Sequence, residues 1–413
     1  MAGEWPLVHL GELAQNFDAR RVPLSSRERE KRRGPYPYYG ATGVMDYVDA
    51  FLFEGLYLLL AEDGSVETAD GKPFLQLVDG KFWVNNHAHV LKAATDEDTK
   101  FLYYALSTVA IRPYISGSVQ AKLSQANMNR ILVPYPPDEC DRRAIAHILG
   151  TLDDKIEVNR RQSETLEAMA RALFQSWFVD FEPVRAKMNP PSPRGRGAGG
   201  EGIYDLFPDR LVESELGPIP EGWDVRKLGD YSLNFDSKRV PLSGRDRAKH
   251  KGSFPYHGAA GVLDYVDDYL FDGIYLLIGE DGSVMRQSGL AVTQYVWGKF
   301  WVNNHAHVLQ GKYPVSTEQL YLYFNFEPVA PYVTGAVQPK LSQGRMNSMP
   351  FLFAGEEVCL EFHKIVEPWF AKFRACAEES RALAALRDTL LPKLISGQLR
   401  VAQAERFLQE QGL

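Results

Sequence analysis

The chain has 413 residues, of which 45% are hydrophobic and 24% are charged, and its formal net charge is −7. This length exceeds one ordinary domain and supplies enough apolar material for real cores, so we expect two to four units. The acidic balance argues mildly against a nucleic-acid-binding protein, although the distribution of charge decides that question rather than its sum.

The sequence also indicates a compartment. Because no run of about 18 uncharged apolar residues occurs, we expect no membrane span. The opening "MAGEWPLVHLGEL" has neither a basic leader nor an apolar signal core, so no secretory signal is expected. Cys140, Cys359 and Cys376 lack CxxC spacing, which is typical of a reduced, cytoplasmic protein and not of a disulfide-rich one.

A tandem duplication organises the chain. A shift of 218 positions places Trp5 on Trp223 and aligns "RVPLS", "EDGSV" and "KFWVNNHAHVL", each of which occurs twice unchanged. About half of the paired residues between 5 and 129 are identical without a gap. The period is far longer than the roughly 20–50 residues of a solenoid repeat. We therefore interpret the chain as two copies of one domain, each followed by a helix.

The first copy, residues 1–137, predicts a mixed α and β domain. "YLLLAEDGSV" and "KFWVNNHAHVL" are typical of strands bounded by turns. The spacing of Phe101, Leu102 and Ala105 predicts a short helix near 97–108. The second copy, residues 219–353, predicts the same elements.

Heptad patterns predict long helices over 138–182 and 354–396, each about 60 Å long. Since an apolar stripe needs a partner, we expect the two helices to pair antiparallel, with Asn159 and Ser163 facing Cys376 and Ser380. The alternative is that each helix packs on its own domain. The fold class is then α+β: two homologous domains joined by two long antiparallel coiled-coil helices with pseudo-two-fold symmetry.

Two further segments complete the predicted organisation. Residues 183–218 are expected to form a linker, because 185–202 are rich in Pro and Gly, and 397–413 form a C-terminal tail. "NPP" at 189–191 resembles a loop of amino-methyltransferases, but Ser192 stands where that loop has an aromatic residue. No phosphate-binding loop, nuclease cluster or Ser-His-Asp arrangement stands out. We predict no catalytic residue and favour a binding protein.

The paired histidines invite a metal interpretation. His87 and His89 alternate with Asn85 along the predicted strand, so all three are expected to share one face. A metal site needs a third or fourth ligand, and none lies at a suitable spacing. We favour structural polar residues over a nucleic-acid contact, and predict no metal site.

Basic residues are concentrated in one segment of each copy. Clustered Arg and Lys neutralise phosphates, and Arg can read guanine edges; the alternative is an ordinary solvated loop. The candidates are Arg20, Arg21, Arg27, Arg29, Lys31, Arg32 and Arg33 in the first copy, and Lys238, Arg239, Arg245, Arg247, Lys249 and Lys251 in the second, with His250 in the same run.

A second candidate segment is "SVQAKLSQANMN" with its counterpart "AVQPKLSQGRMN". Its polar side chains suit base edges and phosphates, while Ser124 and Ser342 could instead cap short helices. The candidate base-reading residues are Lys122, Ser124, Gln125 and Asn127, with Lys340, Ser342, Gln343 and Arg345.

Three phrases resemble specificity subunits of bacterial and archaeal type I restriction–modification enzymes. They are "LEAMARALFQSWFVDFEPVRAKM" (166–188), "LFPDRLVESELGPIPEGW" (206–223) and "LRDTLLPKLISGQLRV" (386–401). "KLSQANMNRI" and "NNHAHVL" are similar to phrases of the target recognition domains of that family. The resemblance covers nearly the whole chain.

The resemblance implies a non-catalytic subunit whose two target recognition domains each bind one half of a split sequence in double-stranded DNA. It implies a helical spacer, two adenine-N6 methyltransferase partners that use S-adenosylmethionine, and ATP- and Mg-dependent translocase/nuclease partners, with no cofactor in this chain. Because the two copies match closely, we expect similar half-sites in a near-palindromic target. The alternatives are a self-contained methyltransferase or nuclease, and a protein-binding scaffold.

Overall fold

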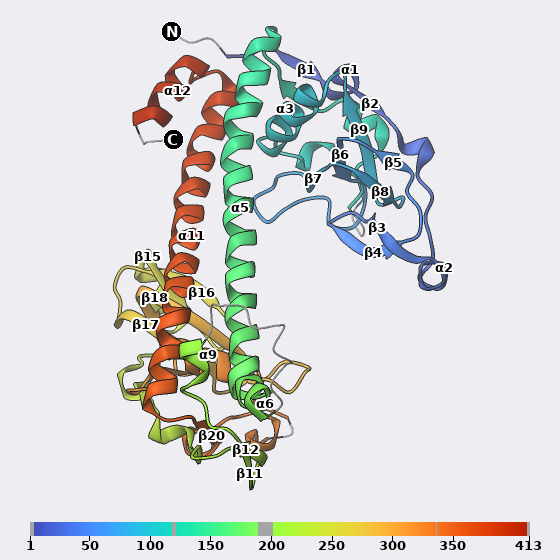
Figure 1. Ribbon diagram of the computed structural model, residues 1–413. Coiled ribbons are helices and arrows are strands. Elements are labelled where there is room, and N and C mark those ends of the chain that lie inside the picture. The colour runs from blue at the N-terminus through green and yellow to red at the C-terminus, as the bar shows by residue number, and fades with distance from the viewer. Residues whose placement is uncertain (1–3, 118–120, 189–200, 336, 411–413) are drawn as a thin grey trace. The chain divides into compact units, whose positions relative to one another are not determined.

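Figure 1 shows the computed structural model, which describes residues 4–117, 121–188, 201–335 and 337–410. The chain divides into two compact units, one formed by residues 1–159 and 379–413 and the other by residues 160–378. Each unit contains one copy of the repeated domain and one half of each of two long helices.

The domain of the first unit contains two four-stranded sheets. The order β2-β9-β6-β7 is antiparallel and comprises Ala14–Asn16, Ala88–Ala93, Tyr57–Ala61 and Leu75–Val78. The order β4-β3-β8-β5 comprises Val44–Val48, Arg33–Tyr39, Lys81–Val84 and Phe53–Glu54, with β3 parallel to β8. A separate pair joins β1 (Leu7–His9) to β10 (Leu132–Pro134).

Four short helices complete this domain: α1 (Leu10–Leu13), α2 (Ser26–Lys31), α3 (Asp96–Ser107) and α4 (Gln125–Asn129). Helix α3 confirms the helix predicted near 97–108. Thr95 caps its N-terminus by accepting a hydrogen bond from the Asp98 N–H, and acidic residues in the first turn favour the positive end of the helix dipole. The predicted apolar face is buried at Phe101, Leu102 and Ala105.

The domain of the second unit joins the equivalent strands into one six-stranded sheet. Its order is β14-β19-β17-β18-β15-β16, with bounds Ser232–Asn234, Ala306–Gly311, Phe271–Gly279, Thr293–Val302, Lys251–His257 and Val262–Val266. The two sheets merge because β17 covers the positions of β5 and β6, and β18 those of β7 and β8. The remaining elements are β13 (Asp224–Lys227) paired with β20 (Pro350–Phe353), α8 (Gly244–Lys249), α9 (Thr317–Tyr323) and α10 (Gln343–Asn347).

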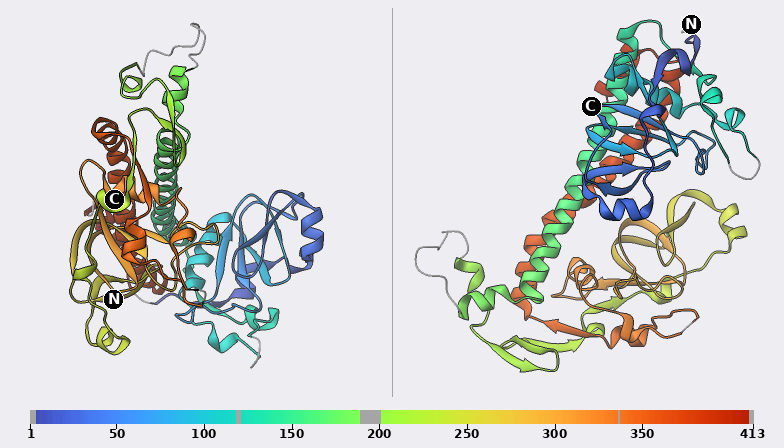
Figure 2. Two further views of the ribbon diagram at one scale, coloured as in Figure 1. Left: turned by 90° about the horizontal axis from the view of Figure 1, so that it is seen from below. Right: turned by 90° about the vertical axis from the view of Figure 1, so that its right-hand side faces the viewer.

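The long helices are α5 (Glu139–Phe178) and α11 (Glu356–Ser396). They lie side by side and antiparallel within each unit (Figure 2). In the first unit Asp153 pairs with Arg387 at 2.6 Å and Lys155 with Glu379 at 3.5 Å. In the second, the rings of Phe174 and Trp177 pack on Phe362. The fold class predicted from the sequence, two repeated α+β domains and two long antiparallel helices, is confirmed.

Hydrogen bonds join the two helices in the polar middle, in the register expected from the sequence. Asn159 donates from Nδ2 to Glu379 Oε2 at 2.8 Å in the first unit. In the second, the Cys376 thiol donates to Gln162 Oε1 at 3.3 Å. Asn159 therefore contacts the residue next to Ser380, and Cys376 contacts the residue next to Ser163.

Each helix packs on a domain as well as on the other helix, so both of the packing arrangements considered from the sequence occur. One core joins α3 and the first sheet to Ile145 and Leu149 of α5 and to Leu390 and Leu394 of α11. The other core joins α9 and the large sheet to the remaining halves of both helices, with an aromatic cluster around Phe362. The helices are thus part of both domain cores.

The segment predicted as a linker, 183–218, contains short elements of secondary structure. Helix α6 (Glu182–Met188) precedes residues 189–200, which lie outside the described residues together with the "NPP" tripeptide. After them come α7 (Glu201–Tyr204) and a hairpin of β11 (Leu211–Ser214) and β12 (Gly217–Pro220). Phe207 is buried against Trp177, which anchors this segment. The tail contains α12 (Val401–Glu410), whose Ala404 is buried.

Candidate nucleic-acid interface

A buried polar network links the basic segment of the first domain to its histidine strand. His89 is 1% exposed, with Nδ1 2.6 Å from Asp18 Oδ2 and Nε2 2.8 Å from the carbonyl oxygen of Leu123. Because a carbonyl oxygen only accepts, Nε2–H donates to Leu123, and a second proton lies on the short Nδ1–Oδ2 hydrogen bond. Arg21 donates from Nη1 to Glu62 Oε2 and to the Ala88 carbonyl oxygen, both at 2.7 Å.

The electrostatics of the network favour ionised carboxylates. Burial would raise the pKa of Asp18, but hydrogen bonding with His89 outweighs it and holds that pKa below its usual value. The pKa of Glu62 is also lowered, since the hydrogen bond from Arg21 outweighs burial. Asp18, Glu62 and His89 are close enough together to be metal ligands. Arg21 and the His89 protons already neutralise both carboxylates, which favours a structural role for His89.

The expectation that His87 and His89 share a face is wrong. Strand β8 ends at Val84 and β9 begins at Ala88, so residues 85–87 form a turn rather than continuous strand. Asn85 Oδ1 accepts from the His87 N–H at 2.8 Å and closes that turn, a habit of Asn side chains that the strand pattern concealed. His87 is exposed and contacts Asp63 through Nδ1 at 2.6 Å.

The second domain repeats the network residue for residue. His307 is 1% exposed, and its Nδ1 and Nε2 lie 2.5 Å from Asp236 and 2.7 Å from the Leu341 carbonyl oxygen. Arg239 donates to Glu280 at 2.7 Å. In both domains the network ties the candidate "KLSQ" segment to the sheet through the leucine carbonyl group and through the lysine that pairs with the network glutamate.

The structure divides the basic residues by their environment, and four of them are engaged inside the domains. The Arg29 guanidinium stacks on Tyr38, donates to the Leu24 carbonyl oxygen at 2.7 Å and pairs with Asp46 at 3.1 Å. Arg21 belongs to the buried network. Their counterparts Arg247 and Arg239 make the same contacts. These four residues stabilise the fold through contacts inside the domains.

A second group is exposed or half-buried, and partnered. Arg32 pairs with Asp49 at 2.9 Å and stacks on Trp83, and Arg33 pairs with Asp46 at 3.2 Å while its side chain is 68% exposed. The other members contact a backbone oxygen, a ring or a carboxylate: Arg20 with Leu52, Lys238 with Phe235, His250 with Asp267 and Lys251 with Asp264. Exposed ion pairs of this kind are weak, so these cations can exchange a carboxylate for a phosphate.

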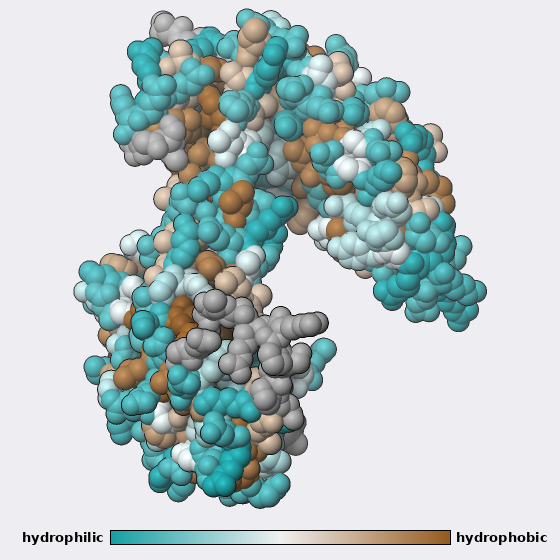
Figure 3. Space-filling view, in the orientation of Figure 1, coloured by the Kyte–Doolittle hydropathy of each residue, from teal (hydrophilic) through white to brown (hydrophobic). Residues whose placement is uncertain are grey.

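Arg27 and Lys31 on α2, with Arg245 and Lys249 on α8, form the third group. All four are exposed, and within residues 4–117 and 201–335 no hydrogen bond or ion pair engages their side chains. A spacing of four places each pair on one helix face. Helix α2 begins with a capping box of Ser25 and Glu28, and its end of the domain is hydrophilic (Figure 3). We call these four residues the free cations.

In the "KLSQ" segments, the helix-cap alternative is confirmed. Ser124 accepts from the Asn127 N–H, and Ser342 accepts from the Arg345 N–H. Lys122 and Lys340 pair with Glu62 and Glu280 at 3.2 and 3.3 Å. Gln125 and Gln343 are exposed, so they remain available as base-reading residues.

The position of Asn127 and Arg345 differs between the copies. Asn127 is half-buried and donates to the Tyr114 carbonyl oxygen at 3.0 Å. Arg345 is exposed on α10, and among the described residues its side chain has no hydrogen-bond or ion-pair partner. The second domain therefore presents one more available cation than the first at this position.

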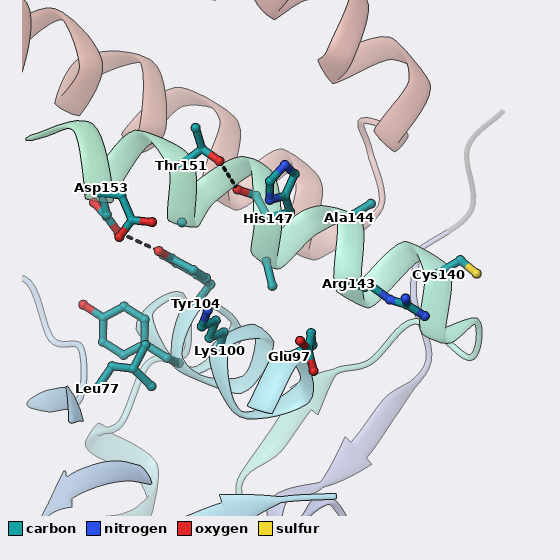
Figure 4. A pocket seen from close by; sticks show the side chains of 14 residues that line it. Leu77, Glu97, Lys100, Tyr104, Cys140, Arg143, Ala144, His147, Thr151 and Asp153 are labelled. Carbon is teal, nitrogen blue, oxygen red and sulfur yellow. Dashed lines mark hydrogen bonds between the residues drawn. The ribbon is translucent and has the colours of Figure 1, made fainter. Parts of the chain in front are cut away.

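A groove also lies within the first unit, between α3 and the first turns of α5 (Figure 4). Its volume is about 820 Å³, and its lining includes Leu77, Lys100, Tyr104 and Asp153. Tyr104 donates to Asp153 Oδ2 at 2.7 Å, and burial together with Asp153 raises the pKa of Tyr104 well above its usual range. In the second copy Tyr295 replaces Leu77 and packs on Phe370 and Phe373 of α11.

Two copies of one α+β domain, each with exposed cations and a capped polar segment, fit a protein with two DNA-recognition domains. The family model of the type I restriction modification DNA specificity domain matches residues 2–168 and 220–352. The chain belongs to this family, the specificity subunits of type I restriction–modification systems.

Similar proteins include the type I restriction enzyme MjaIX specificity subunit of Methanocaldococcus jannaschii, 26% identical over 331 residues, which are 74% of this chain and 70% of that protein. The type I restriction enzyme HindI specificity subunit of Haemophilus influenzae is 23% identical over 312 residues, 64% of this chain and 68% of that protein. The crystal structure of an S subunit from M. genitalium shares the fold, with a TM-score of 0.58, 17% identity, and coverage of 95% and 96% of the two chains.

Among the described residues, none of the helices combines the length and the apolar character that crossing a membrane needs.

Proposed function

We propose that each repeated domain binds one half of a bipartite duplex site, and that the two half-sites are similar and inverted. The observation that carries this proposal is the duplication of the DNA-facing surface itself. The free cations, the capped "KLSQ" helices and the network behind them occur at equivalent positions of both domains. Equal reading surfaces favour equal half-sites.

The free cations and the partnered surface cations hold phosphates, while Gln125 and Gln343 read base edges. Phosphate contacts position the protein, and contacts with base edges specify the sequence. Arg345 adds a guanine-reading candidate in the second domain, where Asn127 of the first is engaged with the backbone. The two half-sites therefore differ at the base pair that this position reads.

The subunit itself is non-catalytic in this proposal. The exposed faces of α5 and α11 dock two adenine-N6 methyltransferase subunits, and ATP-dependent translocase subunits complete the restriction complex. S-adenosylmethionine, ATP and Mg then bind to those partners. The opposing possibility, a self-contained methyltransferase, is tested by methyl-donor binding to the isolated chain, where saturable binding would overturn this assignment.

The deciding experiment maps methylated bases across the source genome with and without this gene. We expect N6-methyladenine to disappear at one split, near-palindromic site, which reads out both half-sites together. Loss at a site with two unrelated halves would contradict the inverted repeat. An unchanged map, in a strain where the subunit is expressed and assembled with its partners, would contradict the proposed function.

A further inference from the structure

An apolar surface is exposed at the same place in both domains. It lies on β4 and β16, which are the terminal strands of their sheets. The exposed side chains are Val44, Met45 and Tyr47 in the first domain and Val262, Leu263 and Tyr265 in the second, each between 44% and 59% exposed. A terminal strand with large exposed apolar residues is an aggregation hazard that proteins usually avoid, so a surface kept in both copies needs an explanation.

The strand is held so that these residues face outward. Asp46 lies between Met45 and Tyr47, and its carboxylate accepts from Arg29 at 3.1 Å and Arg33 at 3.2 Å. Because successive side chains alternate across a strand, Met45 and Tyr47 lie on the face opposite to Asp46. In the second domain Asp264 pairs with Arg247 and Lys251 in the same way. The polar residue fixes the strand, Met45 accepts a hydrogen bond from Asn85 Nδ2 at 3.4 Å, and more than half of its surface stays exposed.

Exposed cations lie beside the strand in both domains. Arg33 and Lys251 are 68% and 60% exposed beside the strands. The free cations lie on helices that pack on β4 and β16. An apolar strip bordered by exposed cations is complementary to a partner that is both anionic and partly apolar.

Duplex DNA has that chemistry, because its grooves present thymine methyl groups and base surfaces between two rows of phosphates. We propose that Met45 and Tyr47, and likewise Leu263 and Tyr265, contact DNA bases directly, while the adjacent cations hold the flanking phosphates. Apolar side chains of this kind contact thymine methyl groups or enter between base steps. This inference rests on the proposed function and adds specificity-determining residues to it.

The test uses the full chain co-purified with its methyltransferase partners, and a duplex carrying the mapped methylation site. The variants are Met45→Ala and Leu263→Ala. Their matched controls are Leu7→Ala and Leu233→Ala, which remove exposed apolar side chains from β1 and β14 of the same units. Affinity is measured at several salt concentrations, on the site and on a scrambled duplex of the same length.

We expect each variant to bind the site roughly tenfold more weakly, as the loss of one buried apolar contact predicts, and each control to bind like the wild type. The slope of affinity against salt should not change, because no phosphate contact is removed. Equal affinity of variants and controls for the site would overturn the inference. Weaker assembly with the methyltransferase at unchanged DNA affinity would also overturn the inference, because it would show that the exposed apolar residues of β4 and β16 contact a protein partner. If the wild-type complex cannot distinguish the site from the scrambled duplex, the proposed function itself fails.

Discussion

The buried histidine of each domain offers the sharpest test of what stabilises the DNA-facing surface. Replacing His89 by Phe keeps a flat ring of similar size and removes both ring N–H groups. The hydrogen bond to Asp18 is charge-assisted and is worth roughly 1.5–3 kcal/mol, and leaving the Leu123 carbonyl oxygen buried without a donor costs roughly 1–3 kcal/mol more. Allowing some gain from the apolar ring, we expect a local destabilisation of about 3 kcal/mol.

Hydrogen exchange of backbone amides measures this loss by position. Peptides covering 82–93 and 121–129 should exchange roughly a hundredfold faster in the His89→Phe variant, while the equivalent peptides of the second domain serve as an internal reference. The matched control is His87→Phe, since that ring is exposed and makes one contact, with Asp63. It should change exchange less than threefold. A His89→Phe chain with wild-type exchange in the first domain would refute the argument that the network holds the "KLSQ" segment.

Three further predictions concern charge. Changing Arg27 and Lys31 to Gln should reduce the slope of log affinity against log salt by about 1.8, since each phosphate contact contributes about 0.9. The folded-state pKa values of Asp18 and Asp236 lie below their unfolded values, so these carboxylates stabilise the fold above about pH 4. This contribution is lost as the pH falls through the folded-state values. When the pH is lowered from 6 to 3, the urea midpoint should therefore fall less in a chain with both Asp18→Asn and Asp236→Asn than in the wild type. Arg345→Asn should change base preference in one half-site only, as read by methylation mapping.

Each of these has its own contrary result. For the α2 variant, the slope of log affinity against log salt is compared with that of a chain changed to Gln at Arg112 and Arg143, which are exposed cations elsewhere in the first unit. Equal slopes would show that α2 does not contact DNA phosphates. A urea midpoint that falls equally in wild type and the double Asn variant would mean that other carboxylates dominate. Unchanged preference at both half-sites would exclude Arg345 as a base reader.

Sequence patterns were sufficient for the architecture because the information is periodic. A duplication is visible as identity at a fixed offset, and a heptad seam predicts a paired helix whatever its partner. Both survive in the structure, as the burial of Ile145 and Phe362 shows. The helix at 96–107 followed from the same periodicity.

The site was harder to predict because it depends on which partner each cation finds. Arg27 and Arg29 are the same residue type in one basic run, yet Arg27 is one of the free cations whereas Arg29 contacts Tyr38, Leu24 and Asp46. Asp46 lies 17 positions away from Arg29 in the sequence, beyond any local pattern. The exposed strip on β4 was missed for a related reason: an alternating run such as "VMDYV" predicts a strand with one buried face, and does not say which face the core takes.

The groove beside α3 leads to a difference in stiffness between the two domain–helix joints. In the second unit Tyr295 and Trp297 fill that place, with ring contacts to Phe370 and Phe373 and a hydrogen bond from Trp297 to Glu378 at 2.9 Å. In the first unit the same place holds Leu77 and empty volume. Close packing transmits strain and resists rocking, whereas a gap beside a helix allows it. We therefore expect the domain–helix joint of the second unit to be stiffer at this place than that of the first.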